Sequence, residues 1–254
     1  MTKVDRKVIE AREIQFYADI YKNEAYNQVG NRLRLRRELH SLQKLSGSKK
    51  FKRVLSVGCG HGEFEILLAP YVEHITAIDI SPEAIEVANS KKNKHKIENI
   101  DFKCQSFSEI NWNEKFDSII CLAFLHHVPE QALLNFLKQA YKNLKPGGFF
   151  YSQDPNLHGI LRKIGRIVLG RNYDKYHTPD ERELDITDLT KIIKAAGFQS
   201  VKIKYTDFTL IPGLYMFPKG PDLLMSLFLG TDLVLCNSPL ASLASGFAAI
   251  SRKI

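Results

Sequence analysis

A glycine-rich turn between an apolar segment and a helix constrains this chain more than any other feature. The apolar segment Val54–Val57 leads into Gly58, Gly60 and Gly62, which form a GxGxG pattern, and a second apolar segment ends in Asp79. Glycine lets the backbone turn sharply and approach a ligand without interference from a Cβ atom. The pattern is therefore typical of a nucleotide-type cofactor site at the mouth of a parallel sheet.

The glycine spacing separates two kinds of cofactor site. A dinucleotide fingerprint reads GxGxxG, and this chain has Glu63 where the third glycine would stand. The chain instead has the tighter GxGxG form. The carboxylate of Asp79, at the tip of the second strand, can accept hydrogen bonds from both hydroxyls of a ribose.

Five segments in the same order resemble the motifs of class I S-adenosylmethionine-dependent methyltransferases, and together they cover about residues 51–205. They are the glycine turn with Asp79, Phe116–Cys121, Leu125–Pro129 (LHHVP), Asn143–Phe149 (NLKPGGF) and Ala195–Phe198 (AAGF). One GxGxG alone would be weak evidence, but five ordered segments are specific. The resemblance is strongest to members that act on quinones, lipids, sugars and natural products. It implies S-adenosylmethionine as the cofactor and S-adenosylhomocysteine as the product.

The resemblance also implies an α/β fold, a Rossmann-like doubly wound sheet of seven strands with the last strand antiparallel and with helical cap insertions. Ser81 and Thr187 are the expected N-caps of two helices. The predicted divisions are an N-terminal helical cap (1–50), a cofactor-binding methyltransferase core (51–207) with an insertion at 155–185, an apolar cap insertion (208–245) and a final core strand (246–254).

The insertion at 208–245 is unusually apolar, yet Asp222, Gly230 and Asp232 interrupt it. A membrane-spanning helix needs ~20 apolar residues, so we expect none here. The preceding strand points its carboxyl end toward the ligand side of the sheet. This position predicts a cap that forms a substrate pocket, with a packing extension or a dimer contact as the alternative.

Two departures from the family pattern concern the cofactor. The family usually has Asp or Glu at the position of Ser56, where it helps to hold the methionine end. It usually has Asp at the position of Ser106, where it accepts a hydrogen bond from the adenine amino group. A serine hydroxyl can take either role without charge, so each contact is expected to be weaker. A degenerate fold that binds no cofactor is the alternative.

The resemblance implies further contacts with the cofactor. Phe107 is expected beside the adenine, although simple packing explains it equally well. Tyr17 and Tyr26 belong to N-terminal helices that cover the cofactor in similar enzymes, and both are also compatible with a core position. The full predicted cofactor-binding set is Ser56, Gly58, Cys59, Gly60, Gly62, Asp79, Ile80, Ser106, Phe107, Leu122, Tyr17 and Tyr26.

Methyl transfer from a sulfonium is an in-line displacement, which requires an aligned acceptor and a site cleared of water. No metal site is predicted. A base is needed only where the attacking atom carries a proton that must leave. His127 is the best candidate base and His126 the second, because both follow the fourth strand and a neutral imidazole accepts protons at physiological pH. The alternative is that one histidine packs and the other caps a turn.

Cysteine content and net charge bear on where the protein acts and on its partners. Four cysteines without paired spacing and a charged N-terminal segment without a signal-peptide pattern predict a cytoplasmic protein. The formal net charge of +8 in 254 residues is compatible with solvated helix faces, an anionic substrate, an anionic membrane surface or nucleic acid.

The favoured hypothesis is methyl transfer to a small or amphiphilic acceptor, such as a lipid-like molecule met at a membrane face, through attack by oxygen, nitrogen or carbon. One rival is an RNA or protein methyltransferase that docks through its basic surface, although nucleic acid is not the expected partner. Another is a non-catalytic module that binds the cofactor and holds a partner chain. The oligomeric state and the identity of the acceptor are left open.

Overall fold

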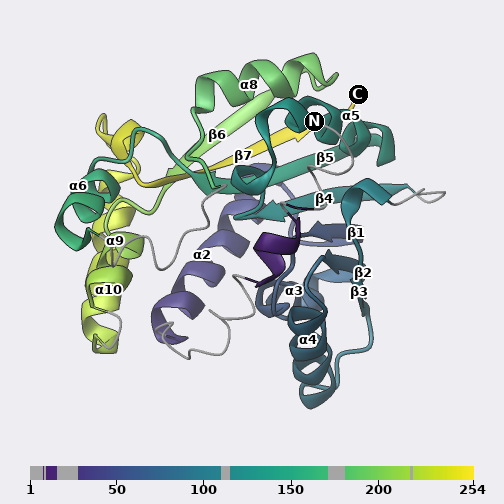
Figure 1. Cartoon of the computed structure of the whole chain (residues 1–254), viewed down its shortest axis with the longest axis horizontal. Helices are drawn as coiled ribbons and strands as arrows, with labels where there is room; N and C mark the ends of the chain where they lie inside the picture. Colours follow the sequence, from purple (N-terminus) through teal and green to yellow (C-terminus); the bar gives the residue numbers. More distant parts are fainter. Residues whose placement is uncertain (1–7, 9, 16–27, 110–114, 171–180, 218–219) are drawn as a thin grey trace.

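Seven strands form one sheet in the order β3-β2-β1-β4-β5-β7-β6 (Figure 1). The computed structural model describes residues 8, 10–15, 28–109, 115–170, 181–217 and 220–254. The strands are β1 (Phe51–Val57), β2 (Val72–Asp79), β3 (Ile100–Cys104), β4 (Phe116–Leu122), β5 (Leu144–Pro155), β6 (Val201–Thr206) and β7 (Gly246–Arg252). Neighbouring strands from β3 to β5 are parallel, whereas β7 runs antiparallel to both β5 and β6. The predicted fold, with its antiparallel last strand, is confirmed.

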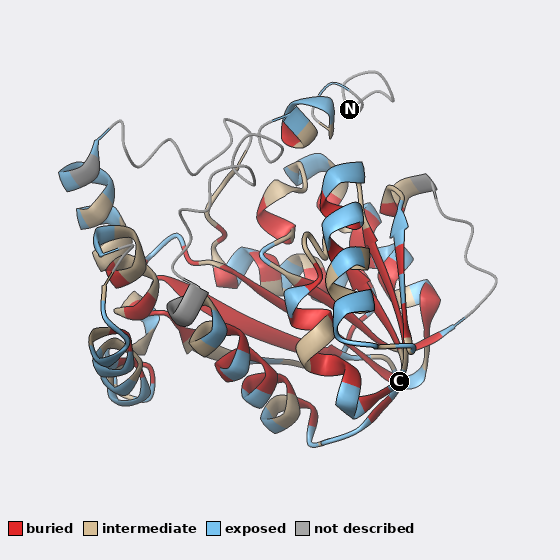
Figure 2. Ribbon diagram, turned by 90° about the horizontal axis from the view of Figure 1, so that it is seen from below, coloured by how far each residue is buried: buried red, intermediate tan, exposed pale blue. Residues whose placement is uncertain are grey.

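Helices cover both faces of the sheet, with α5 and α8 on one face and α2, α3 and α4 on the other (Figure 1). Side chains alternate along β1, so that Leu55 and Val57 pack toward α5 and α8 while Val54 packs toward α2 and α3. Figure 2 shows that buried residues are concentrated along the strands. The α-helices are α2 (Gln28–Ser46), α3 (Glu63–Leu68), α4 (Pro82–Lys94), α5 (Glu130–Asn143), α6 (Ile160–Leu169), α8 (Ile186–Ala195), α9 (Leu210–Met216) and α10 (Asp222–Leu235), and the short 3-10 helices are η1 (Ala69–Tyr71), η2 (Phe107–Glu109), η3 (Leu125–His127) and η4 (Ala241–Leu243).

The two predicted helix caps differ in outcome. Ser81 caps α4 as expected, because its side chain accepts a hydrogen bond from the backbone N–H of Ala84. The prediction for Thr187 is wrong, since Asp185 is the N-cap of α8 and accepts from the backbone N–H groups of Thr187 and Asp188. A carboxylate at the N-cap also faces the positive end of the helix dipole, which favours Asp185.

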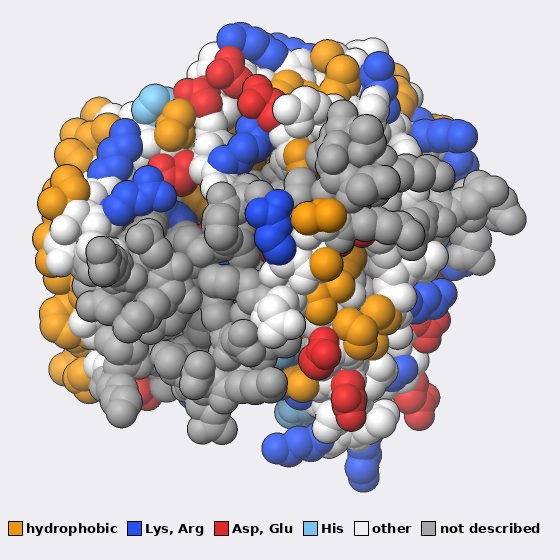
Figure 3. Space-filling view, in the orientation of Figure 1, with side chains coloured by type: hydrophobic (Ala, Val, Ile, Leu, Met, Phe, Trp, Pro, Cys, Tyr) orange, Lys and Arg blue, Asp and Glu red, His pale blue; other side chains and the backbone are white. Residues whose placement is uncertain are grey.

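Three helices gather beyond the carboxyl ends of β5 and β6. Helix α6 follows β5, and α9 and α10 follow β6. They present apolar side chains to solvent, and Figure 3 shows these side chains along the left edge of the molecule. The most exposed apolar residues of these helices are Ile160, Ile164, Ile167 and Val168 on α6, Met216 on α9, and Leu223, Leu227, Leu233 and Val234 on α10. Among the described residues, no helix is both long enough and apolar enough to cross a membrane.

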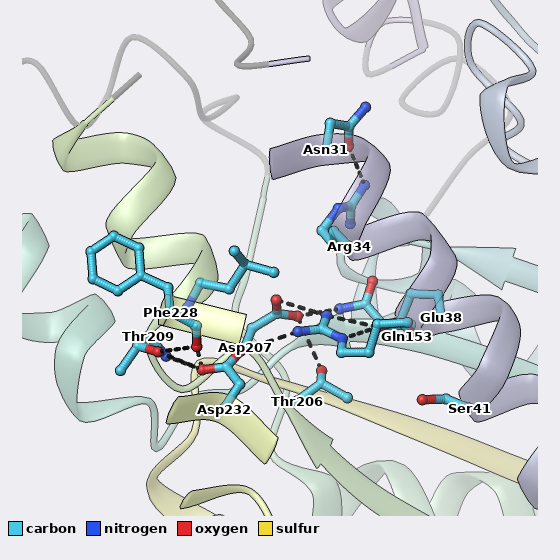
Figure 4. Close-up of polar contacts among 12 residues, drawn as sticks. Asn31, Arg34, Glu38, Ser41, Gln153, Thr206, Asp207, Thr209, Phe228 and Asp232 are labelled. Atoms are coloured by element: carbon cyan, nitrogen blue, oxygen red, sulfur yellow. Dashed lines mark hydrogen bonds and ion pairs between the residues drawn. The ribbon is translucent and has the colours of Figure 1, made fainter. Parts of the chain in front are cut away.

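A buried ion cluster ties α10 to α2 and β6 (Figure 4). The guanidinium of Arg37 on α2 lies 2.8 Å from Asp207 Oδ1, just after β6, and 3.1 Å from Asp232 Oδ2 on α10. It also lies 2.8 Å from Glu38 Oε1. All four side chains are buried. Asp232 Oδ1 in turn accepts hydrogen bonds from the backbone N–H and the hydroxyl of Thr209 at the start of α9. The cluster therefore holds α10 and the start of α9 against α2 and the end of β6.

Candidate cofactor and catalytic site

The glycine turn lies where β1 meets α3, at the carboxyl edge of the sheet. The backbone N–H groups of Gly58 and Cys59 donate to the carbonyl oxygen of Ile78, at 2.9 and 3.1 Å. The backbone N–H of Gly60 donates to Asp79 Oδ2 at 2.8 Å. The glycine turn and the predicted ribose-binding acid are therefore held together as one unit before any ligand is considered.

The glycines are required by their backbone conformation and surroundings. Gly58, Gly60 and Gly62 have φ values of 72°, 49° and 70°, in the left-handed region that favours glycine. A Cβ atom on Gly58 would lie 2.5 Å from a ring carbon of Phe124, and one on Gly62 would collide with Phe102. Substitution at these positions would deform the turn that the cofactor must approach.

Asp79 keeps hydrogen-bonding capacity for a ligand. Its Oδ1 accepts from the backbone N–H of Ser81 at 3.0 Å and its Oδ2 accepts from Gly60, but each carboxylate oxygen has a second lone pair. The side chain is half-buried. Burial raises the pKa of Asp79 above its ordinary value and outweighs the backbone hydrogen bonds, which lower it.

Ser56 is engaged within the protein. It is buried, and its hydroxyl donates to Glu65 Oε1 on α3 at 2.5 Å. The other oxygen of that carboxylate, Oε2, is buried without a hydrogen-bond partner in the described part of the chain. Sequence reasoning missed Glu65, although its place one helical turn after the glycines could have indicated it.

The remaining predicted cofactor contacts lie at the ends of β2, β3 and β4. Ser106 donates to Glu10 Oε1 at 2.9 Å, which places the helical residues 10–15 over this edge of the sheet. The ring of Phe107 is buried against Phe136, with ring centroids 4.5 Å apart. Ile80 and Leu122 are half-buried at the same edge. Contacts of these residues with the cofactor stay predictions, and Tyr17 and Tyr26 lie outside the described residues.

The two histidines occupy η3, directly after β4, with ring centroids 4.0 Å apart. His126 Nδ1 lies 3.1 Å from Asp154 Oδ1, near the end of β5. His127 Nδ1 lies 3.1 Å from Glu13 Oε2, and its Nε2 lies 3.8 Å from Glu181 Oε1. The sequence indicated the histidines but not their three acidic neighbours.

Burial and charge oppose each other in this cluster. Burial alone would lower the pKa of His127, but the hydrogen bond and charge of Glu13, with the charges of Glu181 and Asp154, raise it above the ordinary value. Burial raises the pKa of Asp154 to about 8, despite its backbone hydrogen bonds. The acidic neighbours therefore favour the protonated form of His127 more than water does.

The histidine cluster also has the spacing of possible metal ligands. Ligand atoms of His126, His127 and Glu181 all lie within 4.8 Å of one another. Each imidazole Nδ1, however, already faces a carboxylate. The prediction of a metal-independent site therefore needs a direct test with a chelator.

Similar solved structures share the fold. One is the N-methyltransferase NodS from Bradyrhizobium japonicum in complex with S-adenosylhomocysteine, with a TM-score of 0.57, 17% identity, and coverage of 88% of this chain and 87% of that chain. Another is phosphoethanolamine N-methyltransferase 2 from Haemonchus contortus in complex with S-adenosylmethionine, with a TM-score of 0.61, 17% identity, and coverage of 86% and 52%. At such identities the likeness establishes the fold alone.

The family model described as a methyltransferase domain matches residues 48–197. The chain belongs to this family, and it is a class I S-adenosylmethionine-dependent methyltransferase with S-adenosylmethionine as its cofactor. The matched range contains the glycine turn, Asp79 and both histidines.

The chain is also similar in sequence to several enzymes that are named ubiquinone biosynthesis O-methyltransferase. A ubiquinone biosynthesis O-methyltransferase from Xylella fastidiosa (strain 9a5c) is 38% identical over 123 residues, which cover 48% of this chain and 48% of the relative. The enzyme of that name from Idiomarina loihiensis is 28% identical over 180 residues, covering 67% and 71%. The one from Coxiella burnetii (strain RSA 493) is 33% identical over 118 residues, covering 45% and 49%. The chain thus spans about half the length of the first of the curated relatives that it matches.

The residues present fit this cofactor. The glycine turn has the left-handed backbone that glycine favours, Asp79 has lone pairs for ribose hydroxyls, and a buried carboxylate oxygen of Glu65 has no hydrogen-bond partner among the described residues. Asp79 would hold the ribose and the turn would hold the amino-acid end. The predicted chemistry of the site is thus consistent with its geometry.

We expect Asp79→Ala to weaken S-adenosylhomocysteine binding by roughly 10- to 100-fold per lost hydrogen bond, because a bond to a charged group is worth about 1.5–3 kcal/mol. Titration calorimetry measures this change. Asp101→Ala is the control, since it removes an exposed carboxylate from the neighbouring strand β3. Unchanged affinity in the Asp79 variant would remove the ribose assignment.

Proposed function

We propose that this enzyme methylates a hydroxyl group of an amphiphilic, lipid-like acceptor. The proposal rests on His127, which follows β4 at the carboxyl edge of the sheet with its Nδ1 3.1 Å from Glu13 Oε2, and on the exposed apolar side chains of α6, α9 and α10 beyond the ends of β5 and β6. The names of the curated relatives, ubiquinone biosynthesis O-methyltransferases, support an oxygen acceptor on an apolar molecule.

His127 takes the proton of the acceptor hydroxyl. Its Nδ1 faces Glu13, so an Nδ1–H directed at that carboxylate leaves Nε2 as the basic nitrogen. S-adenosylmethionine, when bound, would supply an electrophilic methyl group and would leave as S-adenosylhomocysteine once its methyl carbon–sulfur bond breaks. The acceptor oxygen forms the new carbon–oxygen bond as it loses its proton. His127 retains the proton, and Glu13 and Glu181 balance the resulting positive charge. His126, whose Nδ1 faces Asp154, supports the position of η3.

We assign the apolar part of the acceptor to the neighbourhood of a small groove between α6 and α9. Its lining comes from both helices and consists of Leu161, Arg162, Gly165, Ile211, Pro212, Tyr215 and Met216. Arg162 lies 3.0 Å from Glu183 through its Nε, so its charge is balanced beside the groove. Such a lining suits a hydrocarbon or isoprenoid-like chain better than a sugar or a peptide.

The exposed face of α6 suits an anionic membrane surface. Ile167 and Val168 are 82% and 68% exposed, and exposed Lys163 and Arg166 lie on the same helix. A helix with apolar and basic side chains together is typical of interfacial binding. We therefore propose that the enzyme meets its acceptor at a bilayer, with α6 in the headgroup region.

We expect Ile167→Glu to reduce binding to vesicles of anionic phospholipid by roughly tenfold or more, because burial of an isoleucine side chain contributes about 1.5–3 kcal/mol. Co-sedimentation with vesicles measures the bound fraction. Val87→Glu is the matched control, since it adds the same charge to an exposed position of α4. Equal binding by both variants and the wild type would contradict the role of α6.

The direct test of the acceptor class uses methyl-labelled S-adenosylmethionine with a whole-cell extract. We expect the label to enter one molecule of the organic phase as an alkali-stable methyl ether. Label recovered in RNA or in protein would instead support docking through the basic surface. S-adenosylhomocysteine binding without any transfer would support the non-catalytic module. Methyl transfer should persist after treatment with a chelator. Loss of transfer would indicate that a bound metal ion, and not His127 alone, activates the acceptor.

A further inference from the structure

Glu65 is a buried carboxylate of which only one oxygen has a hydrogen-bond partner among the described residues. It lies on α3, it is 2% exposed, and its Oε1 accepts the hydroxyl of Ser56. Its Oε2 is buried and accepts no hydrogen bond from the described residues. A buried carboxylate oxygen left without a partner is costly, so such an atom calls for a ligand or another explanation.

The surroundings of Glu65 place it at the glycine turn. Its charge acts on Cys59, within the turn, and the charge of Asp79 acts on Glu65. Ser56, its hydrogen-bond donor, lies one residue before the end of β1, the strand that leads into Gly58. The carboxylate therefore lies close to the turn, on the side of the sheet covered by α2 and α3.

Two negative charges act on Glu65. Asp79 and Glu63 both act to raise its pKa, and burial, the largest cause, brings that pKa to about 7 despite the hydrogen bond from Ser56. Glu63, which is exposed, already has Lys91 Nζ at 2.7 Å. A cation with N–H groups at Oε2 would supply the missing hydrogen bond and would offset the repulsion between Glu65 and the two neighbouring acids.

We propose that Glu65 recognises the cofactor through its α-ammonium group, with Oε2 accepting an ammonium N–H while Ser56 holds Oε1 in place. Of the groups on S-adenosylmethionine, the ammonium alone combines positive charge with N–H donors. We assign Asp79, at the end of β2, to the ribose. The pair Ser56 and Glu65 thus carries the negative charge that Ser56 alone lacks. This inference depends on the cofactor assignment and not on the identity of the acceptor.

Two ligands separate this role from a general effect on the turn. S-adenosylhomocysteine has the amino-acid end, whereas 5′-deoxy-5′-methylthioadenosine lacks it and keeps the adenosine. We expect Glu65→Gln to weaken S-adenosylhomocysteine binding by roughly tenfold or more and to leave methylthioadenosine binding unchanged, because the lost bond involves two charged groups. Titration calorimetry measures both affinities without turnover.

Glu63→Gln is the matched control, because it makes the same change on the same helix at an exposed position, and it should alter neither affinity. Equal weakening of both ligands by Glu65→Gln would mean that Glu65 only supports the turn, and unchanged binding of both would exclude any role. Both results overturn the proposal.

Wild-type protein gives a second test that does not depend on the folding of a variant. An analogue of S-adenosylhomocysteine with hydrogen in place of the amino group should bind roughly tenfold more weakly or worse than S-adenosylhomocysteine itself. Equal affinities would contradict the proposal. Failure of methyl transfer to a lipid acceptor would leave either result intact, so the two proposals fail separately.

Discussion

Replacing His127 with alanine should lower turnover by about 10²- to 10⁴-fold, the usual contribution of a positioned general base. Without the imidazole, the acceptor hydroxyl loses the group that we propose takes its proton. S-adenosylhomocysteine affinity should stay at the wild-type value, since the proposed ribose and amino-acid contacts come from other residues. Single-turnover rates with a saturating acceptor measure the loss. His40→Ala, an exposed histidine on α2, is the control.

The base role of His127 also predicts how kcat/KM depends on pH. His127 must be neutral to accept a proton, so kcat/KM should fall as the pH drops through its pKa. Despite burial, Glu13, Glu181 and Asp154 raise that pKa above the ordinary value of an imidazole, so the acidic limb should lie at higher pH than for a free imidazole. Glu13→Gln removes the largest of the contributions that raise the pKa, and it should move the limb to lower pH. Wild-type turnover in His127→Ala, or an unmoved limb in Glu13→Gln, would exclude the base role.

Replacing Arg37 with alanine should lower the free energy of unfolding by about 3–5 kcal/mol, the usual cost of removing one partner from a buried ionic cluster. Three buried carboxylates, those of Glu38, Asp207 and Asp232, would lose the guanidinium that balances them. Urea unfolding measures the change. Arg36→Ala is the matched control, because it removes the same side chain from an exposed position one residue earlier on α2.

The deficit of the Arg37 variant should depend on pH. Burial already raises the pKa of Asp232 in the wild type. Arg37 lowers the pKa of Asp232, so without Arg37 this carboxyl should titrate at still higher pH. Acidification then neutralises Asp232 and should narrow the difference in stability between variant and wild type. A loss of stability equal to that of Arg36→Ala would show that the cluster does not hold the cap to the core.

The fold and half of the site follow from local sequence patterns. The glycine turn and Asp79 belong to one strand–turn–helix–strand unit, so their spacing along the chain already determines their meeting in space. The strand order and the antiparallel β7 follow from the family resemblance. The sequence pattern predicts the N-cap of α8 two residues too late, at Thr187 and not at Asp185, because both residue types favour N-cap positions.

The rest of the site depends on tertiary contacts that no local pattern encodes. Arg37 meets Asp207 and Asp232 across 170 and 195 residues of sequence. Glu13 reaches His127 from the N-terminal helical segment, and Asp154 reaches His126 from the neighbouring strand. Glu65 was overlooked because an acid in the first turn of a helix is usually read as favourable to the helix dipole. Its burial against Ser56 becomes visible only when α3 is packed on β1.

A crystal structure of the protein with bound S-adenosylhomocysteine tests the proposed site most directly. We predict that the ribose hydroxyls lie within hydrogen-bonding distance of Asp79 and that the sulfur faces the space between His127 and the groove of α6 and α9. A product molecule whose sulfur points away from η3, or one bound elsewhere than at the glycine turn, would contradict it.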